Sequence, residues 1–246
     1  TLFSCAIFLI FSFVKDSFAC IPGKGLHRAS KAIMRFVRQY KYVLQCDIRK
    51  FYPSIDHMVM FNIIKKKIAD KRLLGVLRNI IWSCGDEKNL PIGNLTSQWM
   101  GNVYLNELDH FVKEQLRCRG YIRYCDDFCL FSNNKSILHE YEIKLRKFVF
   151  DKLKLIFSKS AIRSLTNGIA FIGYRHFKKF IILRKYGARK IRKHILNIAI
   201  HNDKSDLDKV SNTESNFQNK IMINSEKNIN NINNLVNMSR NPNSSM

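Results

Sequence analysis

The sequence is short of acidic residues and has no paired cysteines, and both shortages restrict what the protein can be. It holds 19 acidic residues against 42 basic ones, a formal net charge of +23. Such an excess indicates a polyanionic partner, most often nucleic acid and sometimes an acidic membrane surface, although a merely basic protein carries the same charge. The seven cysteines are odd in number and include no C-x-x-C pair. This usage favours a reduced, cytoplasmic protein over a disulfide framework or a zinc site.

The sequence also lacks an apolar run of membrane-spanning length. Its first fourteen residues, TLFSCAIFLIFSFV, are mostly apolar but short for a membrane span. They resemble the apolar part of a signal peptide, yet no basic segment precedes them. We favour a buried helix or strand over a targeting segment, and we expect no membrane association.

Positive charge and low-complexity sequence lie in different parts of the chain. From Asp203 onward five basic residues balance five acidic ones, so the whole excess lies in residues 1–202. Twelve of the last 44 residues are Asn. A segment this polar cannot bury enough apolar surface to offset its chain entropy, so we expect residues 203–246 to be disordered.

The spacing of apolar residues predicts an α+β fold in which helices pack on an antiparallel sheet. The strand at Tyr42–Ile48 is followed by a helix from about His57, with Asp56 as its N-cap. The remaining predicted elements are a helix after the Pro22–Gly23 turn, a long helix near 95–116, a hairpin at 121–132, a helix at 136–153, a hairpin at 168–183 and a basic helix from 184.

Three aspartates stand at strand ends. Asp47 ends an apolar strand, and Asp126 and Asp127 occupy the turn in YCDDF. Aspartates in a turn are commonly explained by local hydrogen bonding. If the two strands are neighbours, however, three carboxylates converge and raise one another's pKa, and divalent cations relieve the repulsion. Hard oxygen ligands suit Mg²⁺, and two such ions support phosphoryl transfer to a nucleotide.

Six segments together resemble the reverse transcriptases, in that family's order. They are SFACIPGKGLHRA, CDIRKFYPSIDH, LPIGNLTSQW, YCDD, LKLIFSKS and GIAFIGY, and the resemblance covers about residues 14–195. It implies an RNA-directed DNA polymerase with a right-hand fold. We expect partial fingers at 1–40, the catalytic palm at 41–180 and the start of a truncated thumb at 181–202. The implied partners are an RNA template, a DNA or RNA primer, dNTPs and a small basic accessory protein.

The resemblance also implies roles for individual residues. Asp47, Asp126 and Asp127 would bind two Mg²⁺ ions, with the carbonyl of Ile48 completing one shell. Tyr52 would be the steric gate that rejects ribonucleotides. Without the motif it would be read as a core aromatic beside Phe51, and the motif favours the gate. The other implied contacts are Ile92 and Gly93 with the incoming base pair, Lys24 with the triphosphate, Lys159 with the leaving pyrophosphate, and Phe171, Gly173 and Tyr174 as the primer grip.

Lys159 fits an ordinary surface lysine equally well, and the primer-grip segment fits a plain sheet edge. In the substrate loop, IGNLTSQ resembles the reverse transcriptases of diversity-generating retroelements, which implies loose, adenine-directed base selection because Ile92 replaces a hydrogen-bonding Gln. Group II intron or retron enzymes are the alternative, and a truncated, non-catalytic RNA-binding remnant is another. Ile21 replaces an expected Arg, which weakens the triphosphate grip.

Overall fold

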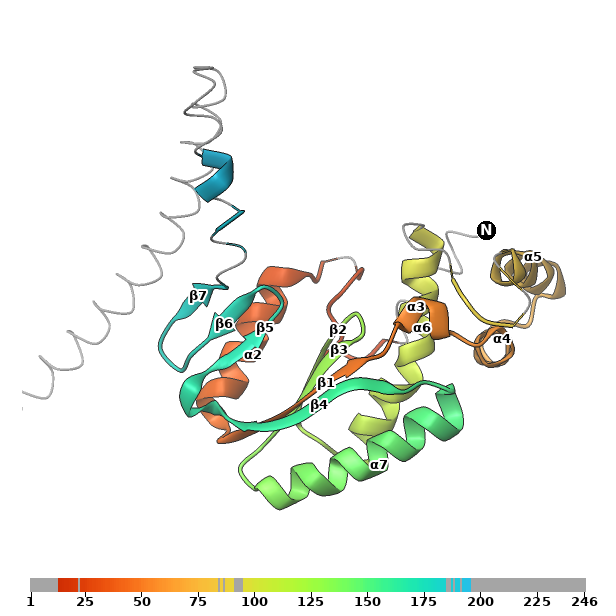
Figure 1. Ribbon diagram of the computed structural model, residues 1–246. Coiled ribbons are helices and arrows are strands. Elements are labelled where there is room, and N and C mark those ends of the chain that lie inside the picture. The colour runs from red at the N-terminus through yellow and green to blue at the C-terminus, as the bar shows by residue number, and fades with distance from the viewer. Residues whose placement is uncertain are drawn as a thin grey trace, which may run out of the picture. The chain divides into compact units, whose positions relative to one another are not determined.

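The computed structural model describes residues 13–21, 23–83, 85, 87–90, 95–184, 187, 189–190 and 192–195. The described residues fall into two units of the chain, 1–183 and 184–246. The first unit is built on an antiparallel sheet of four strands in the order β2-β3-β1-β4 (Figure 1). These strands are β1 (Tyr42–Ile48), β2 (Gly120–Tyr124), β3 (Asp127–Ser132) and β4 (Phe157–Ser164).

The sheet separates two hydrophobic cores. Successive side chains of a strand point to opposite faces, so Leu44 and Cys46 of β1 enter the larger core while Val43 enters the smaller one. The larger core holds α6 (Leu95–His110), its π-helical continuation η1 (Phe111–Gln115) and α7 (Lys135–Leu153). The hydroxyl of Tyr104 in α6 donates to the carbonyl of Leu153 in α7 at 2.6 Å and links the two helices.

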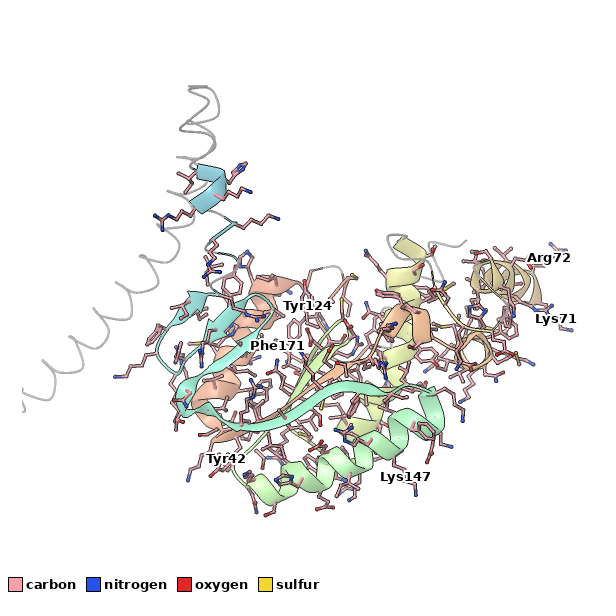
Figure 2. All side chains as sticks on the ribbon, in the orientation of Figure 1. Tyr42, Lys71, Arg72, Tyr124, Lys147 and Phe171 are labelled. Atoms are coloured by element: carbon pink, nitrogen blue, oxygen red, sulfur yellow. The ribbon has the colours of Figure 1, made fainter. Side chains whose placement is uncertain are left out.

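The smaller core joins the opposite face of the sheet to α2 (Leu26–Gln39) and to a second antiparallel sheet. That sheet has the order β5-β6-β7, with β5 (Ile169–Phe171), β6 (Tyr174–His176) and β7 (Ile181–Leu183). Phe171 and the partly buried Tyr124 belong to this core (Figure 2). A hydrogen bond of 2.9 Å between Ser30 of α2 and the ring of His176 fixes the second sheet against the helix.

Between β1 and α6 the chain forms three helices, α3 (Phe51–Ser54), α4 (His57–Lys65) and α5 (Lys71–Trp82). The prediction of an N-cap at Asp56 is confirmed, since its carboxylate accepts from the amide of Val59 at 3.0 Å. The cap satisfies one of the amides that a helix start leaves without an intrahelical partner.

The predicted order lacked α3, α5 and β4, and the hairpin predicted at 168–183 contains three strands, β5, β6 and β7. In α5 only Leu77 and Ile81 are buried, so its apolar stripe is thin. Within β4, FSKSAIRS, only Phe157 is buried. This strand lies at the edge of the sheet, where it needs no continuous apolar pattern.

Several sequence predictions concern residues outside the described part of the chain, including the apolar start up to residue 12 and the Asn-rich segment 203–246. In the second unit, the described residues 187, 189–190 and 192–195 are helical, in agreement with the basic helix predicted from 184. The cysteines at 20, 46, 118, 125 and 129 are free thiols. No helix within the described residues is both long enough and apolar enough to cross a bilayer.

Candidate active site

One row of side chains crosses the four-stranded sheet at the end of β1. Asp47 pairs with Asp127 of β3 on one side and with Lys159 of β4 on the other. Asp127 in turn pairs with Tyr124 of β2. Residues directly opposite each other in an antiparallel pair have Cα atoms about 4.5–5.5 Å apart and share a face. Asp47 is therefore opposite Asp127, as neighbouring strands require, although Asp127 is the first residue of β3 and not part of the turn as predicted.

Asp126 lies in the two-residue turn that joins β2 to β3, beside this row. Cys125, the first residue of the turn, has φ of 54°, in the left-handed region. Burial raises the pKa of the Asp126 carboxyl, and the negative charge of Asp47 raises it further. The two carboxyl groups therefore interact electrostatically, as a convergent acidic site requires.

A register shift follows Asp47, because Ile48 pairs with Phe157 rather than continuing the regular ladder. At this irregularity the hydroxyl of Ser158 donates to the Asp47 carboxylate. The side chain of Ile48 is buried in the larger core. Ile48 therefore has only its backbone to offer the site, and coordination by its carbonyl stays a prediction.

The donor set suits a hard cation, although its carboxylates are not gathered into a ready site. Within the described part of the chain, no group of three His, Cys, Asp or Glu side chains is arranged to hold a metal ion. Asp47 and Asp127 nevertheless face each other in register, and Asp126 is close enough to Asp47 for its pKa to respond. Oxygen donors of this kind suit Mg²⁺. Metal binding by the three aspartates stays a prediction.

Tyr52 stands next to the turn. Burial raises its pKa to about 12, and smaller contributions come from Cys125, Cys20 and Asp126. Its ring packs on Phe51, with ring centroids 5.1 Å apart. A Cβ at Gly101 of α6 would lie 3.3 Å from the Tyr52 ring, so the helix leaves room for this ring by having glycine there. The half-buried ring thus borders the acidic turn, where a steric gate would stand.

Lys24 has a different set of contacts from the one predicted. Its ammonium donates to the carbonyls of Val14 at 3.1 Å, Lys15 at 3.0 Å and Ser17 at 2.8 Å. Burial lowers its pKa. An ammonium has three protons, and these three carbonyls use all of them. In this conformation Lys24 ties the segment before α2 together, and its contact with a triphosphate stays a prediction.

The predicted primer-grip hairpin is formed by β5 and β6. Phe171 is buried in the smaller core and pairs with Tyr174 across the turn, in which Gly173 has φ of 83°. The side-chain amide of Gln45 in β1 donates to the carbonyl of Ala170 at 3.1 Å. This bond fixes the hairpin to the strand that bears Asp47, two residues away. Ile92 and Gly93 lie outside the described residues.

Sequence reasoning missed a buried ion pair beneath the turn. Arg123 of β2 and Asp109 of α6 are both fully buried, and the guanidinium contacts the carboxylate at 2.6 Å. The available signal was an arginine inside the otherwise apolar and aromatic run YIRYC, a position where an unpaired charge would be costly.

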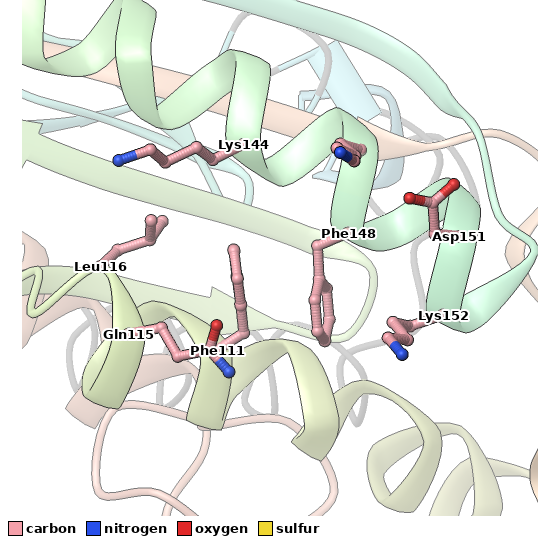
Figure 3. A pocket seen from close by; sticks show the side chains of 8 residues that line it. Phe111, Gln115, Leu116, Lys144, Phe148, Asp151 and Lys152 are labelled. Carbon is pink, nitrogen blue, oxygen red and sulfur yellow. The ribbon is translucent and has the colours of Figure 1, made fainter.

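A cavity of about 390 Å³ lies between η1 and α7 (Figure 3), and its lining includes none of the three aspartates. Phe111 and Phe148 stack on its wall with ring centroids 4.1 Å apart. A second pocket, of about 320 Å³, opens beside α3 and is lined by the basic residues Arg49, Lys50, Lys88 and Lys154.

The sequence and the fold both resemble those of known proteins. The family model described as "Reverse transcriptase (RNA-dependent DNA polymerase)" matches residues 8–176. The retron Ec73 reverse transcriptase of Escherichia coli is 28% identical over 185 residues, which cover 68% of this chain and 58% of that protein. The group II intron-encoded protein LtrA of Lactococcus lactis subsp. cremoris is 28% identical over 100 residues, 37% of this chain and 16% of LtrA.

Among solved structures, the apo telomerase of Candida tropicalis, truncated from its C-terminal domain, matches with a TM-score of 0.59 and 12% identity. The match covers 74% of this chain and 45% of the telomerase chain. This likeness identifies the fold as that of the right-hand polymerases. The chain thus spans 16% to 58% of the length of these relatives.

Proposed function

The chain belongs to the reverse transcriptase family, and we propose that it copies RNA into DNA by adding dNTPs to the 3′-hydroxyl of a primer. The observation that carries this proposal is the register of β1 and β3, in which Asp47 is opposite Asp127 beside the turn that bears Asp126. The family match over residues 8–176 supports it.

In this proposal Asp47, Asp126 and Asp127 hold two Mg²⁺ ions, with the carbonyl of Ile48 as a further ligand. Bound Mg²⁺ supplies charge stabilisation to the attacking 3′ oxygen and to the leaving pyrophosphate. The protein's own task is to hold these carboxylates together. The pairing of β1 with both β3 and β4 supports this by fixing the backbone of Asp47 from two sides and setting it opposite Asp127.

Other residues orient the substrates. The ring of Tyr52 excludes a ribose 2′-hydroxyl beside the turn. Lys159 is exposed and shares the row of Asp47, so its ammonium neutralises the departing pyrophosphate. Lys24 would reach the triphosphate only after giving up its backbone contacts. Phe171, Gly173 and Tyr174 form the hairpin that supports the primer end, and Ile92 and Gly93 contact the incoming base pair.

Primer extension on an RNA template with Mg²⁺ tests this function. Asp126→Asn keeps the size of the side chain but removes its charge. We expect extension to fall by about a thousandfold, the scale of a lost group that supports several kcal/mol of transition-state stabilisation. Asp151→Asn, on the exposed surface of α7, is the matched control and should retain full activity. Nucleic-acid binding by the wild type without any extension would instead support a non-catalytic RNA-binding remnant.

At a finer level, we propose an enzyme of the diversity-generating retroelement type, working with a small basic accessory protein. The motif IGNLTSQ supports this type, and Ser97 and Gln98 within it depart from the intron and retron pattern. Ile92→Gln should reduce misincorporation opposite template adenines, measured by sequencing the DNA product, because Gln restores hydrogen bonding in the base-pair pocket. An unchanged error spectrum would refute the role of Ile92.

A group II intron or retron enzyme is the second candidate. The sequence similarity to LtrA and to the retron Ec73 reverse transcriptase favours it. A near-duplicate repeat pair beside the gene, differing mainly at adenines, would favour the retroelement type. An intron or a retron RNA at that place would favour the second candidate.

A further inference from the structure

The buried ion pair between Arg123 and Asp109 is joined at two points. Nε of Arg123 donates to Oδ1 of Asp109 at 2.8 Å, and Nη2 donates to Oδ2 at 2.6 Å. This fork geometry satisfies both carboxylate oxygens and fixes the plane of the guanidinium. Buried ion pairs contribute little net stability compared with apolar residues of similar size. A contribution to stability is therefore a weak reason for a charge to occupy this position.

The third guanidinium nitrogen reaches the candidate active site. Nη1 of Arg123 donates to the carbonyl of Cys125 at 3.0 Å and to Oδ1 of Asn102 at 3.0 Å. Cys125 is the first residue of the turn between β2 and β3, and its carbonyl belongs to the peptide group that leads into Asp126. Arg123 thus holds the backbone immediately before a predicted metal ligand.

This turn needs a restraint from outside. Two-residue hairpin turns favour Gly or Asn where φ is positive, yet Cys125 occupies that position with φ of 54°. A side chain with a Cβ is strained there and persists only when its surroundings hold it. The hydrogen bond from Nη1 to the Cys125 carbonyl acts directly on the strained residue.

The guanidinium is itself held in place by its neighbours. Oδ1 of Asp109 also accepts from the hydroxyl of Tyr121 at 2.6 Å, and the amide of Asn102 donates to the carbonyl of Ala19 at 2.8 Å. Asp109 and Asn102 both lie on α6, one of the longer helices of the unit. The network therefore connects a rigid helix to the acidic turn through one side chain.

We propose that Arg123 is a positioning residue that fixes the 125–126 turn and so keeps Asp126 beside Asp47 for metal binding. The metal-binding part rests on the proposed function, whereas the ordering of the turn stands by itself. The side chains of Asp47 and Asp126 do not set this geometry by themselves, because the backbone that carries Asp126 is a strained turn.

Arg123→Lys tests the proposal, with Tyr121→Phe as the matched control. Lysine keeps the buried charge next to Asp109, but its compact ammonium cannot also span to Cys125 and Asn102. Tyr121→Phe weakens the same network at Asp109 and leaves the Arg123 contact with Cys125 intact. The readouts are amide hydrogen exchange over residues 124–127 without metal, and Mn²⁺ affinity by electron paramagnetic resonance.

Relative to the wild type, we expect Arg123→Lys to speed exchange of the turn amides more than exchange of the other amides of β2 and β3. We also expect its Mn²⁺ affinity to fall by about tenfold, the lower end for loss of a group that orients metal ligands. Tyr121→Phe should leave both turn exchange and Mn²⁺ affinity unchanged when it is compared with the wild type under conditions of equal global stability. Turn exchange that rises only in parallel with all other amides, or equal Mn²⁺ loss in both variants, would reduce Arg123 to a structural residue and overturn the proposal.

If Arg123→Lys does not fold, the double variant Arg123→Met/Asp109→Leu removes both charges together and leaves no unpaired buried ion. It should fold and still show the faster turn exchange. Failure of the proposed polymerase function can be distinguished from failure of the positioning role. A wild type that never extends a primer, yet shows the exchange difference, contradicts the proposed function and leaves the positioning role standing. Primer extension that depends on Asp126, together with unchanged turn exchange in Arg123→Lys, would support the proposed function and contradict the positioning role.

Discussion

At the scale of single residues, Tyr52 is confined by its neighbours. Phe51 packs against its ring, and Gly101 of α6 approaches so closely that a Cβ there would lie 3.3 Å from the ring. Burial and the nearby turn raise its pKa to about 12, so the hydroxyl is neutral at physiological pH. A neutral, wedged ring acts by its bulk.

Replacing that bulk should change sugar selection. We expect Tyr52→Ala to lower the preference for dNTPs over rNTPs by roughly tenfold or more, the scale on which one steric contact discriminates in a pocket. Tyr52→Phe keeps the ring and should retain the preference. Single-nucleotide insertion with dATP and ATP measures the ratio. If Tyr52→Phe lost the preference as Tyr52→Ala does, the hydroxyl rather than the ring would be the selecting group.

At the scale of elements, β6 is held against α2 by a histidine that the folded protein keeps neutral. The ring of His176 is buried and meets the hydroxyl of Ser30 at 2.9 Å. Burial lowers the pKa of His176 from 6.5 to about 4. The unfolded chain therefore takes up this proton first as the pH falls. The contribution to stability is complete above pH 6.5 and is lost progressively towards pH 4.

This linkage predicts a loss of about 2 kcal/mol in the free energy of unfolding between pH 7 and pH 5 from His176 alone. His176→Gln removes the titration and retains a hydrogen-bonding group for Ser30. Urea unfolding of both proteins at the two pH values measures the difference. Equal losses in the variant and the wild type would show that His176 is not the linked group.

At the scale of the whole molecule, charge determines how the chain meets nucleic acid. The formal charge of +23 arises entirely within residues 1–202, because the acidic and basic residues from Asp203 onward cancel. Lysine and arginine contacts with phosphates release counterions, so the affinity depends on salt in proportion to the number of contacts. Residues 203–246 bring no net charge to such contacts.

Truncation after residue 202 should therefore leave the salt dependence of RNA binding unchanged. Filter binding of a primer–template duplex between 50 and 200 mM salt (about the range over which phosphate contacts dominate) gives the slope of log affinity against log salt. A shallower slope in the truncated protein would mean that basic residues of the removed segment contact phosphates despite their neutral average.

Local sequence was informative wherever one segment carried its own signal. The apolar run in YVLQCDI predicted the strand at its observed bounds, and Asp56 predicted the start of α4. β4 and α5 were missed because an edge strand and a thinly buried helix leave weak apolar patterns. The ion pair of Arg123 with Asp109 was missed because its members lie on different elements, fourteen residues apart.

By itself the sequence determined which acids are available and which strands bear them, since strand patterning and turn chemistry are local properties. Only the tertiary structure decided that Asp47 stands between Asp127 and Lys159, because register depends on pairing between distant segments. It also decided that the ammonium of Lys24 donates to three backbone carbonyls and that the guanidinium of Arg123 donates to the carbonyl of Cys125 in the acidic turn. A buried donor bonds to the acceptors that folding brings within reach, and no short stretch of sequence specifies those acceptors.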